Sequence, residues 1–357
     1  MNGEQTTGTA GAAYFLSYDL LRILAAFSVV VLHVSAQFWY DLPVKDSQWL
    51  IANSYNAAFR FGVPIFVMLS GALFLRPEYK LSVKRLYTHN VLRMAVLFLV
   101  WSAAYGIFDY FGFKLQEFRP DILWAEIKSG RYHLWFLPMI AAIYILLPVL
   151  KSWLNGADKK NVEYFLGVFM VYHIGKNTSL ALFDREALEF LWGAVNLEII
   201  SGYFGYLVLG YYLTRYEVPR KIKRWLYPAA VLGTLCNIVF GNLLSLRAGA
   251  ATGAIFDSYG AFTFLVVTAL FVFFTQDLQN INVSPKTAGV MKGLSKDTLG
   301  IYLLHIGVLE LLQTMGIHNS TIPSVAGIPL LSVVCFCLCA LLAAALRRIP
   351  VLGRWIC

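Results

Sequence analysis

The sequence predicts an all-α membrane protein with about ten transmembrane helices and both termini in the cytoplasm. Of its 357 residues, 59% are hydrophobic and only 14% are charged, and the mean hydropathy is +0.64. A soluble domain carries about 25% charged residues. No long polar tract that could form a separate soluble domain interrupts the apolar segments. We therefore expect a short cytoplasmic tail over residues 1–16, which lacks the basic residues of a signal peptide, and one transmembrane domain over residues 17–357.

The apolar segments follow one another along the whole chain. A transmembrane helix needs about 20 apolar residues, and ten segments reach or approach that length. The fifth is the weakest of them, because Lys176 interrupts it. The expected limits, in chain order, are 18–38, 56–75, 91–111, 133–150, 164–182, 198–214, 226–246, 259–275, 298–313 and 324–346.

The distribution of lysine and arginine predicts the direction of each segment. Most of these residues lie in the loops after segments two, four, six and eight and in the C-terminal tail. Cytoplasmic loops of membrane proteins are enriched in Lys and Arg, so these loops and both termini are expected in the cytoplasm. The net charge of +9 is thus spread in short clusters between apolar segments, which indicates orientation signals rather than a nucleic-acid partner.

The first segment, "YDLLRILAAFSVVVLHVSAQF", carries three ionisable residues: Asp19, Arg22 and His33. Such residues are costly at membrane depth, and they usually face a bundle interior or a cavity. His33 follows Arg22 by about 16 Å along the axis and about three full turns, so both share one face. Asp19 lies one turn before Arg22, at a spacing suited to pairing. This helix face therefore predicts a site that extends from the cytoplasmic boundary into the outer half of the membrane.

The predicted directions place other polar residues at matching depths. The expected positions are Ser70, Arg85 and Arg93 toward the cytoplasm, Tyr302 and His305 at mid-depth, and Arg60, His133 and Trp135 in the outer half.

Each of these residues also has a structural explanation. His33 could be a core histidine bonded to a neighbouring helix, and Arg22 could extend its charge to the interface. Ser70 could allow close helix packing, as small residues do in membranes. Arg85 and Arg93 also serve as orientation signals, while His133 and Trp135 lie where interfacial aromatic belts occur.

The motifs, taken together, resemble the acyltransferase-3 family of integral membrane acyltransferases. That family carries an Arg and a His separated by ten residues on its first transmembrane helix, matched here by Arg22 and His33. The resemblance continues through "VPIFVMLSGALF", "KRLYTHNVLR", "YHLWFLPMIAAIYILLPVL", "GYFGYLVLGYYL", "SKDTLGIYLLH" and "RRIPVLGRW". The "YHLWF" and "SGALF" forms are most similar to stand-alone O-acetyltransferases of surface polysaccharides, including the enzyme of the enterobacterial common antigen.

The resemblance implies an enzyme of the bacterial inner (plasma) membrane that uses acetyl-CoA as acyl donor and a glycan or lipid-linked sugar as acceptor, with no metal. His33 is expected to act as general base, with Arg22, Asp19 and Arg60 as further catalytic residues. The expected coenzyme-binding residues are Arg22, Ser70, Arg85, Arg93, Tyr302 and His305, and the expected acceptor-binding residues are His133 and Trp135.

Two alternatives to an acyltransferase remain open from the sequence. The first is a transporter of an amino acid or an acylated lipid that performs no chemistry, because a polar path through a helix bundle fits it equally well. A transporter needs gates on both sides of a midplane site, whereas this kind of enzyme needs a phosphate site in the cytoplasm. The second is a catalytically silent assembly partner for glycan enzymes, which leaves the pair of Arg22 and His33 unexplained.

Overall fold

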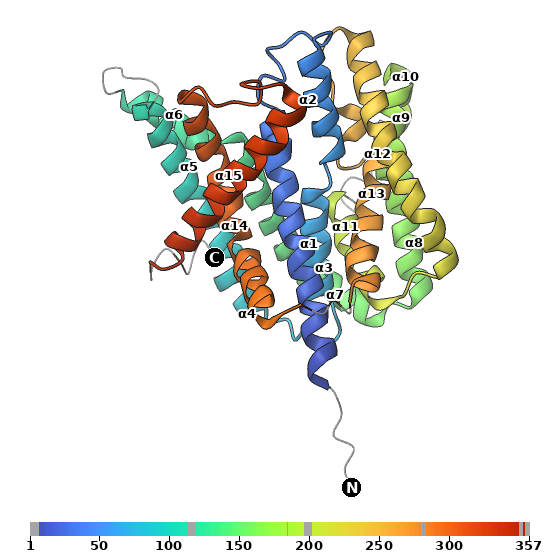
Figure 1. Cartoon of the computed structure of the whole chain (residues 1–357). Coiled ribbons are helices and arrows are strands. Elements are labelled where there is room, and N and C mark those ends of the chain that lie inside the picture. The colour runs from blue at the N-terminus through green and yellow to red at the C-terminus, as the bar shows by residue number, and fades with distance from the viewer. Residues whose placement is uncertain are drawn as a thin grey trace.

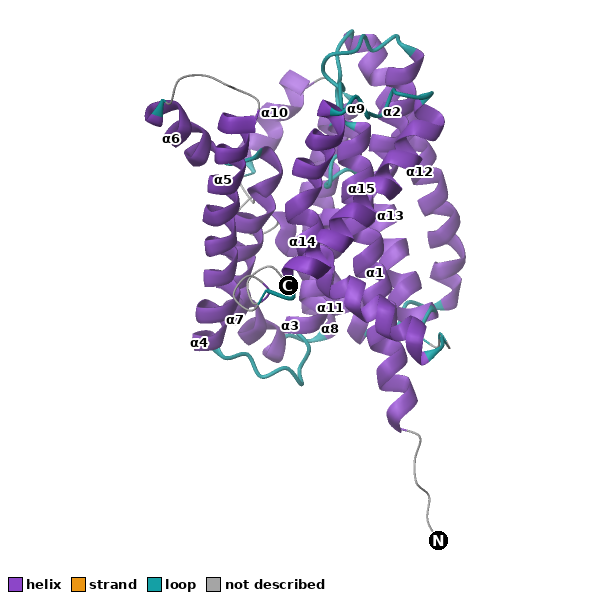
Figure 2. Ribbon diagram, turned by 60° about the vertical axis from the view of Figure 1, so that its left-hand side comes forward, coloured by secondary structure: helices purple, strands orange, loops and turns teal. Residues whose placement is uncertain are grey.

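The structure of the protein is a computed structural model that describes residues 7–112, 119–183, 185–195, 202–279, 281, 283–349 and 353. Every regular element in this part of the chain is a helix, which confirms the all-α class (Figure 2). Elements η1, η3 and η5 are π-helical, and η2 and η4 are 3₁₀-helical. The elements are α1 (Thr7–Ser35), α2 (Ser47–Ala58), α3 (Gly62–Phe74), α4 (Val83–Arg85), η1 (Leu86–Val91), α5 (Leu92–Gly112), α6 (Pro120–Ser129), η2 (Tyr132–Trp135), α7 (Phe136–Gly156), α8 (Lys159–Phe169), η3 (Met170–Gly175), α9 (Lys176–Leu182), α10 (Arg185–Ala194), α11 (Gly202–Arg215), α12 (Arg220–Ala248), η4 (Ala254–Phe256), α13 (Ala261–Val272), η5 (Phe273–Asp277), α14 (Pro285–Thr314) and α15 (Ser324–Leu346).

The long helices stand side by side, and their ends form two faces of the molecule. The lower face in Figure 1 is the one at which α1 begins, and α4 lies there too. The upper face is the one at which α1 ends, and it carries α2 and α6. Helix α1 begins at Thr7, within the stretch that the sequence predicted to be a tail.

Seven helical stretches of the described residues are long and apolar enough to cross a membrane, so the chain is a membrane protein. They match the first four, the seventh, the eighth and the tenth of the predicted segments, and the predicted count of ten is not confirmed. The seven stretches are Leu16–Ser35, Ser47–Phe74, Val83–Tyr110, Tyr132–Gly156, Arg220–Ala248, Ala254–Asp277 and Ser324–Leu346.

The other three predicted segments are helical where the structure describes them, but they differ from a simple apolar span. Segment 164–182 is divided among α8, η3 and α9, with Lys176 at the last junction. Helix α11 has only 14 residues, and 198–201 lie outside the described residues. Helix α14 has 30 residues, but lysines and an aspartate make its first half polar. Charged residues raise the cost of membrane insertion for segment 164–182 and for the first half of α14, whereas α11 is shorter than a membrane span.

The second predicted segment differs from expectation because it is interrupted. The sequence predicted one run over 56–75, whereas the structure starts this span at Ser47 and breaks it between α2 and α3. Pro64 has no N–H group, so it cannot donate the helical hydrogen bond to the carbonyl of Arg60 four residues earlier. Arg60 therefore lies at a turn between two helices rather than inside one.

Helices α3 and α11 approach each other more closely than ordinary side chains permit. A Cβ atom at Gly71 would overlap the carbonyl oxygen of Leu207, and one at Gly210 would overlap that of Met68. The residue numbers rise on one helix as they fall on the other, so the two helices are antiparallel. Small residues allow such close backbone contact in membrane proteins.

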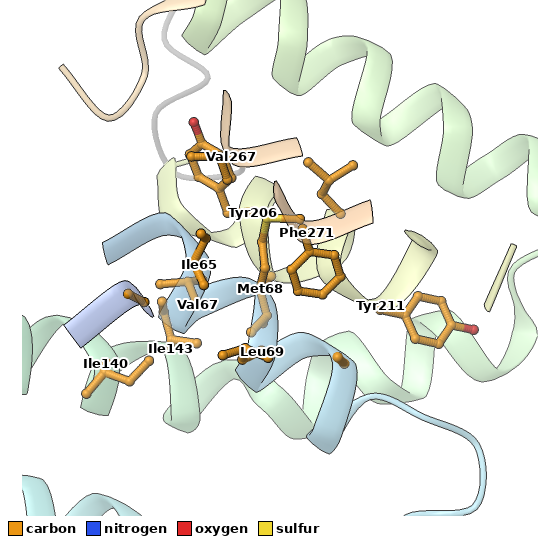
Figure 3. Close-up of a cluster of buried hydrophobic side chains, with 14 of the residues drawn as sticks. Ile65, Val67, Met68, Leu69, Ile140, Ile143, Tyr206, Tyr211, Val267 and Phe271 are labelled. Carbon is orange, nitrogen blue, oxygen red and sulfur yellow. The ribbon is translucent and has the colours of Figure 1, made fainter. Parts of the chain in front are cut away.

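A buried apolar cluster fills the space beside this contact, between α3, α7, α11 and α13 (Figure 3). Met68 and Ile65 of α3 and Phe271 of α13 are completely buried in it, and Ile140 and Ile143 of α7 border it. Lipid tails are as apolar as these side chains, so van der Waals packing rather than transfer out of water holds such helices together. This core fixes the position of α3, which contributes one wall of the site described below.

The predicted orientation can be tested by labelling single cysteines in a background from which the native cysteines have been removed. Ala157→Cys lies on the lower face after α7, and Lys128→Cys lies on α6 at the upper face. If the lower face is cytoplasmic, a membrane-impermeant thiol reagent added to intact cells should label Lys128→Cys and leave Ala157→Cys unlabelled. Both variants should react after permeabilisation. The reverse pattern in intact cells would place the lower face outside.

Candidate functional site

A chamber of about 810 Å³ extends from the lower face into the middle of the bundle. Residues of α1, α3, η1, α5, α7 and α14 line it. Five of the six residues that the sequence assigned to coenzyme binding are in this lining: Arg22, Ser70, Arg85, Arg93 and Tyr302. The deeper walls are mainly apolar and include Val29, Phe66, Leu69, Phe136 and Ile140. The chamber thus combines three arginines with an apolar interior.

Arg22 is held in the chamber wall by two polar neighbours. Its Nη1 atom donates a hydrogen bond of 3.2 Å to Oγ of Ser295 on α14, and Ser295 donates one of 2.6 Å to Oδ1 of Asp19. The same Asp19 oxygen lies 3.6 Å from Nη1 of Arg22, as the spacing of the two residues predicted. A side chain tied at two points loses little further freedom when it binds a ligand, so this arrangement pre-organises the guanidinium.

The other two arginines lie near the lower end of the chamber. Arg85 ends α4 and is exposed, and Arg93 is on the first turn of α5. Between them η1 contributes Thr88, His89 and Asn90 to the lining. Short π-helical segments are rare in proteins, and those that occur are often found at functional sites. The lower end of the chamber is therefore rich in positive charge and in hydrogen-bonding groups, a combination suited to phosphates.

Helices α1 and α14 run side by side in the same direction and form the inner part of the site. Arg22 meets Ser295 near their lower parts, and His33 meets His305 further up, where the ring centroids are 5.0 Å apart. The two pairs are separated by eleven residues on α1 and by ten on α14, which is about 16 Å of helix. The common face predicted for Arg22 and His33 is therefore covered by α14.

Three histidines meet beyond the inner end of the chamber. The His133 ring lies 5.2 Å from that of His305, and the Tyr132 ring lies 5.5 Å from that of His33. His133 and His305 are 1% and 0% exposed and lie deep inside the protein, whereas His33 is half-buried and the neighbouring Tyr132 is 63% exposed. His305 is not a lining residue of the chamber but belongs to this cluster, one turn beyond Tyr302.

The hydrogen bonds of His305 define which of its ring nitrogens can accept a proton. Its Nδ1 atom lies 2.6 Å from the carbonyl oxygen of Tyr302, and because a carbonyl oxygen only accepts, Nδ1 must carry the hydrogen. Nε2 then has a free lone pair, and this buried atom makes no hydrogen bond of ordinary geometry to any described residue. The ring nitrogens of His133 also lack such a partner among the described residues. Buried polar atoms without partners are uncommon and require an explanation such as a ligand.

Tyr302 separates the chamber from the histidine cluster. It lines the chamber, and its hydroxyl donates a hydrogen bond to the carbonyl oxygen of His133. Its ring lies 5.5 Å from that of Phe136, 5.7 Å from that of His133 and 5.9 Å from that of His305. A molecule that enters the chamber from the lower face therefore reaches Tyr302 immediately before the histidines.

Two of the predicted site residues lie outside both groups. Arg60, at the turn between α2 and α3, borders a separate cavity at the upper face, and its guanidinium bonds Oδ1 of Asn56. Trp135 is 46% exposed, and its ring lies 5.9 Å from that of Tyr203. The structure thus brings His133 to the other histidines but directs its neighbour Trp135 elsewhere.

Comparison with known families bears on this arrangement. Residues 15–344 match the family model described as an acyltransferase domain, which is nearly the whole chain. The protein belongs to the acyltransferase-3 family. No curated protein and no solved structure matched the chain. The match covers α14 and the part of α1 from residue 15 onward, and these two helices carry Arg22, Ser295, His33 and His305 of this acyltransferase.

Sequence reasoning missed two groups of residues in this acyltransferase. Ser295 was not singled out, although its spacing of seven from Tyr302 and ten from His305 places all three on one face of a helix. Arg131 was also missed: it bonds Asp109 of α5 at 2.7 Å and pairs with Glu310 of α14. This ion cluster holds the start of η2 against α5 and α14, and it thereby positions His133 two residues later. No local motif marks such long-range pairs.

Proposed function

We propose that this acyltransferase is an O-acetyltransferase of the bacterial plasma membrane, with the lower face in the cytoplasm. It transfers the acetyl group of acetyl-CoA to a hydroxyl group of a cell-surface or lipid-linked glycan. The observation that carries the proposal is the chamber itself, which has three arginines in its lining and ends at Tyr302, beside a cluster of three histidines. This order of groups corresponds to the order of the donor's parts, from charged phosphates to reactive thioester.

The donor is expected to bind with its phosphates at the lower end of the chamber. Arg85 and Arg93 lie there, and Arg22 is directed into the lining by Asp19 and Ser295. Arginine suits this role because its planar guanidinium donates several hydrogen bonds and keeps its charge. The narrow pantetheine arm is then expected to lie along the apolar walls and bring the thioester to Tyr302.

The histidine cluster supplies the proton transfer that the reaction needs. We assign the general base to His33, which accepts the hydroxyl proton as the acceptor oxygen forms its bond to the acetyl carbonyl carbon. The carbon–sulfur bond then breaks, and the proton passes to the coenzyme A thiolate. A positioned general base contributes about 10²–10⁴-fold in rate. His305 lies beside His33 with its Nδ1 hydrogen fixed by Tyr302, which suits it to hold the neighbouring ring and share the proton.

The order of charges also supports an enzyme over a transporter. Arg22, Arg85 and Arg93 are all on the chamber side of Tyr302, which is where a phosphorylated donor from the cytoplasm needs them. A transporter that moved its cargo across the membrane needs a site that opens alternately to both faces. Arg60 borders the separate cavity at the upper face, so the feature that the acetyl-CoA proposal explains is the group of three arginines in the chamber lining.

The donor site can be tested by calorimetry with acetyl-CoA and with its 3′-dephospho analogue. Acetyl-CoA should bind more tightly, and its affinity should fall as salt rises, because exposed charges are screened. Arg85→Gln should weaken binding about tenfold to a hundredfold, the loss expected for a charge-assisted contact. Arg220→Gln is the control, because it removes an exposed arginine that is outside the chamber lining. Equal affinity for acetyl-CoA and its 3′-dephospho analogue would contradict a phosphate site in the chamber. Equal losses of acetyl-CoA affinity in Arg85→Gln and Arg220→Gln would contradict it too.

A further inference from the structure

A second cavity, of about 320 Å³, lies at the upper face. Residues from four segments border the cavity: Trp39, Tyr40, Arg60, Asn177 and Asp257. Trp39 and Tyr40 follow the end of α1, and Arg60 lies at the turn between α2 and α3. Asn177 is on α9, and Asp257 follows η4. Small-molecule sites have volumes of about 300–1,000 Å³, so the cavity suffices for one small group. Four segments that are far apart in the sequence converge there.

The cavity lies beyond the upper end of α1, the helix that contributes Arg22 and Val29 to the donor chamber. Helix α1 ends two residues after His33, and Trp39 and Tyr40 follow on the same chain segment. A molecule in this cavity therefore lies on the upper-face side of His33, whereas the donor chamber extends from the lower face.

The lining is partly rigid and presents complementary polar groups. The guanidinium of Arg60 is held by two hydrogen bonds to Asn56 Oδ1, of 2.8 and 2.5 Å, and lies 5.1 Å from the centre of the Phe256 ring. Trp39 is 7% exposed and is fixed by a 2.9 Å hydrogen bond from Nε1 to Oδ1 of Asn53. Asp257 also borders the cavity, and its Oδ1 accepts the backbone N–H of Tyr259 at 3.1 Å. A carboxylate accepts hydrogen bonds, so the lining contains both a charged donor and a charged acceptor.

These features fit an uncharged ring that carries several hydroxyl groups. The charges of Arg60 and Asp257 cancel, so the lining has no excess of positive charge to favour an anion. The rings of Trp39 and Tyr40, whose centroids are 4.8 Å apart at an interplanar angle of 80°, form an aromatic corner. Aromatic side chains have an apolar body that can pack against the C–H groups of a sugar ring. Hydroxyl groups both donate and accept, which matches the arginine and the carboxylate.

We propose that this cavity is the acceptor subsite and that it binds a neutral sugar residue of the glycan, with the hydroxyl that is acetylated directed toward His33. The inference rests on the proposed O-acetyltransferase function and adds the position and the chemical class of the acceptor. It predicts that acceptor and donor occupy separate cavities on either side of the histidines. Residues of the upper cavity should then affect the acceptor without affecting acetyl-CoA.

The test uses the full chain, expressed in cells that lack the gene, with Asp257→Asn and Tyr40→Ala as cavity variants. Tyr40 is 84% exposed, so its truncation leaves the core intact. The control is Asp41→Asn, which removes the same charge from an exposed carboxylate that is outside the cavity lining. Mass spectrometry of released surface sugars measures acetylation, and calorimetry of the purified proteins measures acetyl-CoA affinity. Membrane levels of all variants are compared by immunoblot.

The inference expects about tenfold or greater loss of acetylation in Asp257→Asn, since a charged hydrogen-bond partner is removed, with unchanged acetyl-CoA affinity. The control Asp41→Asn should acetylate the glycan as well as the original chain does. The acetylated sugar should be uncharged. Three results would each contradict the acceptor subsite. They are normal acetylation by both cavity variants, weaker acetyl-CoA binding in the cavity variants, and an acetylated sugar that is acidic. If the original chain acetylates no glycan, the proposed function itself fails, an outcome that is distinct from a failure confined to the cavity variants.

Discussion

Replacement of His33 by alanine should reduce acetyl transfer by about 10²–10⁴-fold, because the group that accepts the hydroxyl proton is lost. Acetyl-CoA should still bind with nearly its original affinity, since Arg22 lies about three helical turns from His33 and all three arginines of the chamber remain in place. Arg22→Ala should do the reverse and weaken donor binding about tenfold to a hundredfold. Single-turnover transfer from radiolabelled acetyl-CoA and equilibrium binding of the donor separate the two effects.

His318→Ala is the control for this experiment, because it removes a histidine near the upper face that is outside the cluster. Its ring contacts Phe38 and its Nδ1 atom contacts Ser320, so its loss should leave transfer unchanged. Full transfer activity in His33→Ala would show that this histidine has only a structural role. In that case Nε2 of His305, a buried atom with an available lone pair, becomes the candidate base.

Gly71→Ala is expected to give the largest loss of stability among single substitutions at glycine. The added methyl group would overlap the carbonyl oxygen of Leu207, which is part of the helix backbone and cannot rotate away. Overpacking of a core costs about 1–3 kcal/mol, and more where the backbone has to move. The expected result is a clear fall in the midpoint of thermal unfolding in detergent, together with reduced membrane insertion.

Gly167→Ala is the matched control, because no atom lies within 4 Å of a Cβ built at this position on α8. Alanine is favoured over glycine inside a helix by about 0.5–1 kcal/mol, so this variant should be as stable as the original chain or more stable. Similar midpoints for the two variants would show that α3 and α11 are not in close contact in the membrane.

Apolar length predicted most of the membrane helices from the sequence, because the signal is local to each segment. Seven candidate spans coincide with predicted segments. The break before α3 was missed, although Pro64 contains the reason for it. Helix α14 was predicted only over its apolar half, and its polar first half continues the same helix from Pro285. Periodicity within one helix therefore predicts a face, but a hydropathy threshold underestimates a helix that begins in polar residues.

The grouping of site residues was predictable where a single helix carries the information. The shared face of Arg22 and His33 follows from helix geometry alone, and the direction of the segments brought Arg85 and Arg93 to the same end as Arg22. Contacts between distant segments were not predictable. Neither the bridge through Ser295 nor the separate position of Arg60 depends on local spacing. These features depend on which helices become neighbours, and one sequence does not contain that information in any short motif.

Tyr302 has a consequence for the membrane as well as for the reaction. One cavity extends inward from the lower face and another lies at the upper face, so a layer of packed side chains is left between the two cavities. Tyr302, Phe136 and His133 pack together in that layer, and the tyrosine hydroxyl is bonded to the His133 carbonyl. For the proposed O-acetyltransferase, whose donor and acceptor lie on opposite sides of this layer, we expect the packed side chains to act as a seal. We expect the seal to block protons and ions while the acetyl group is transferred.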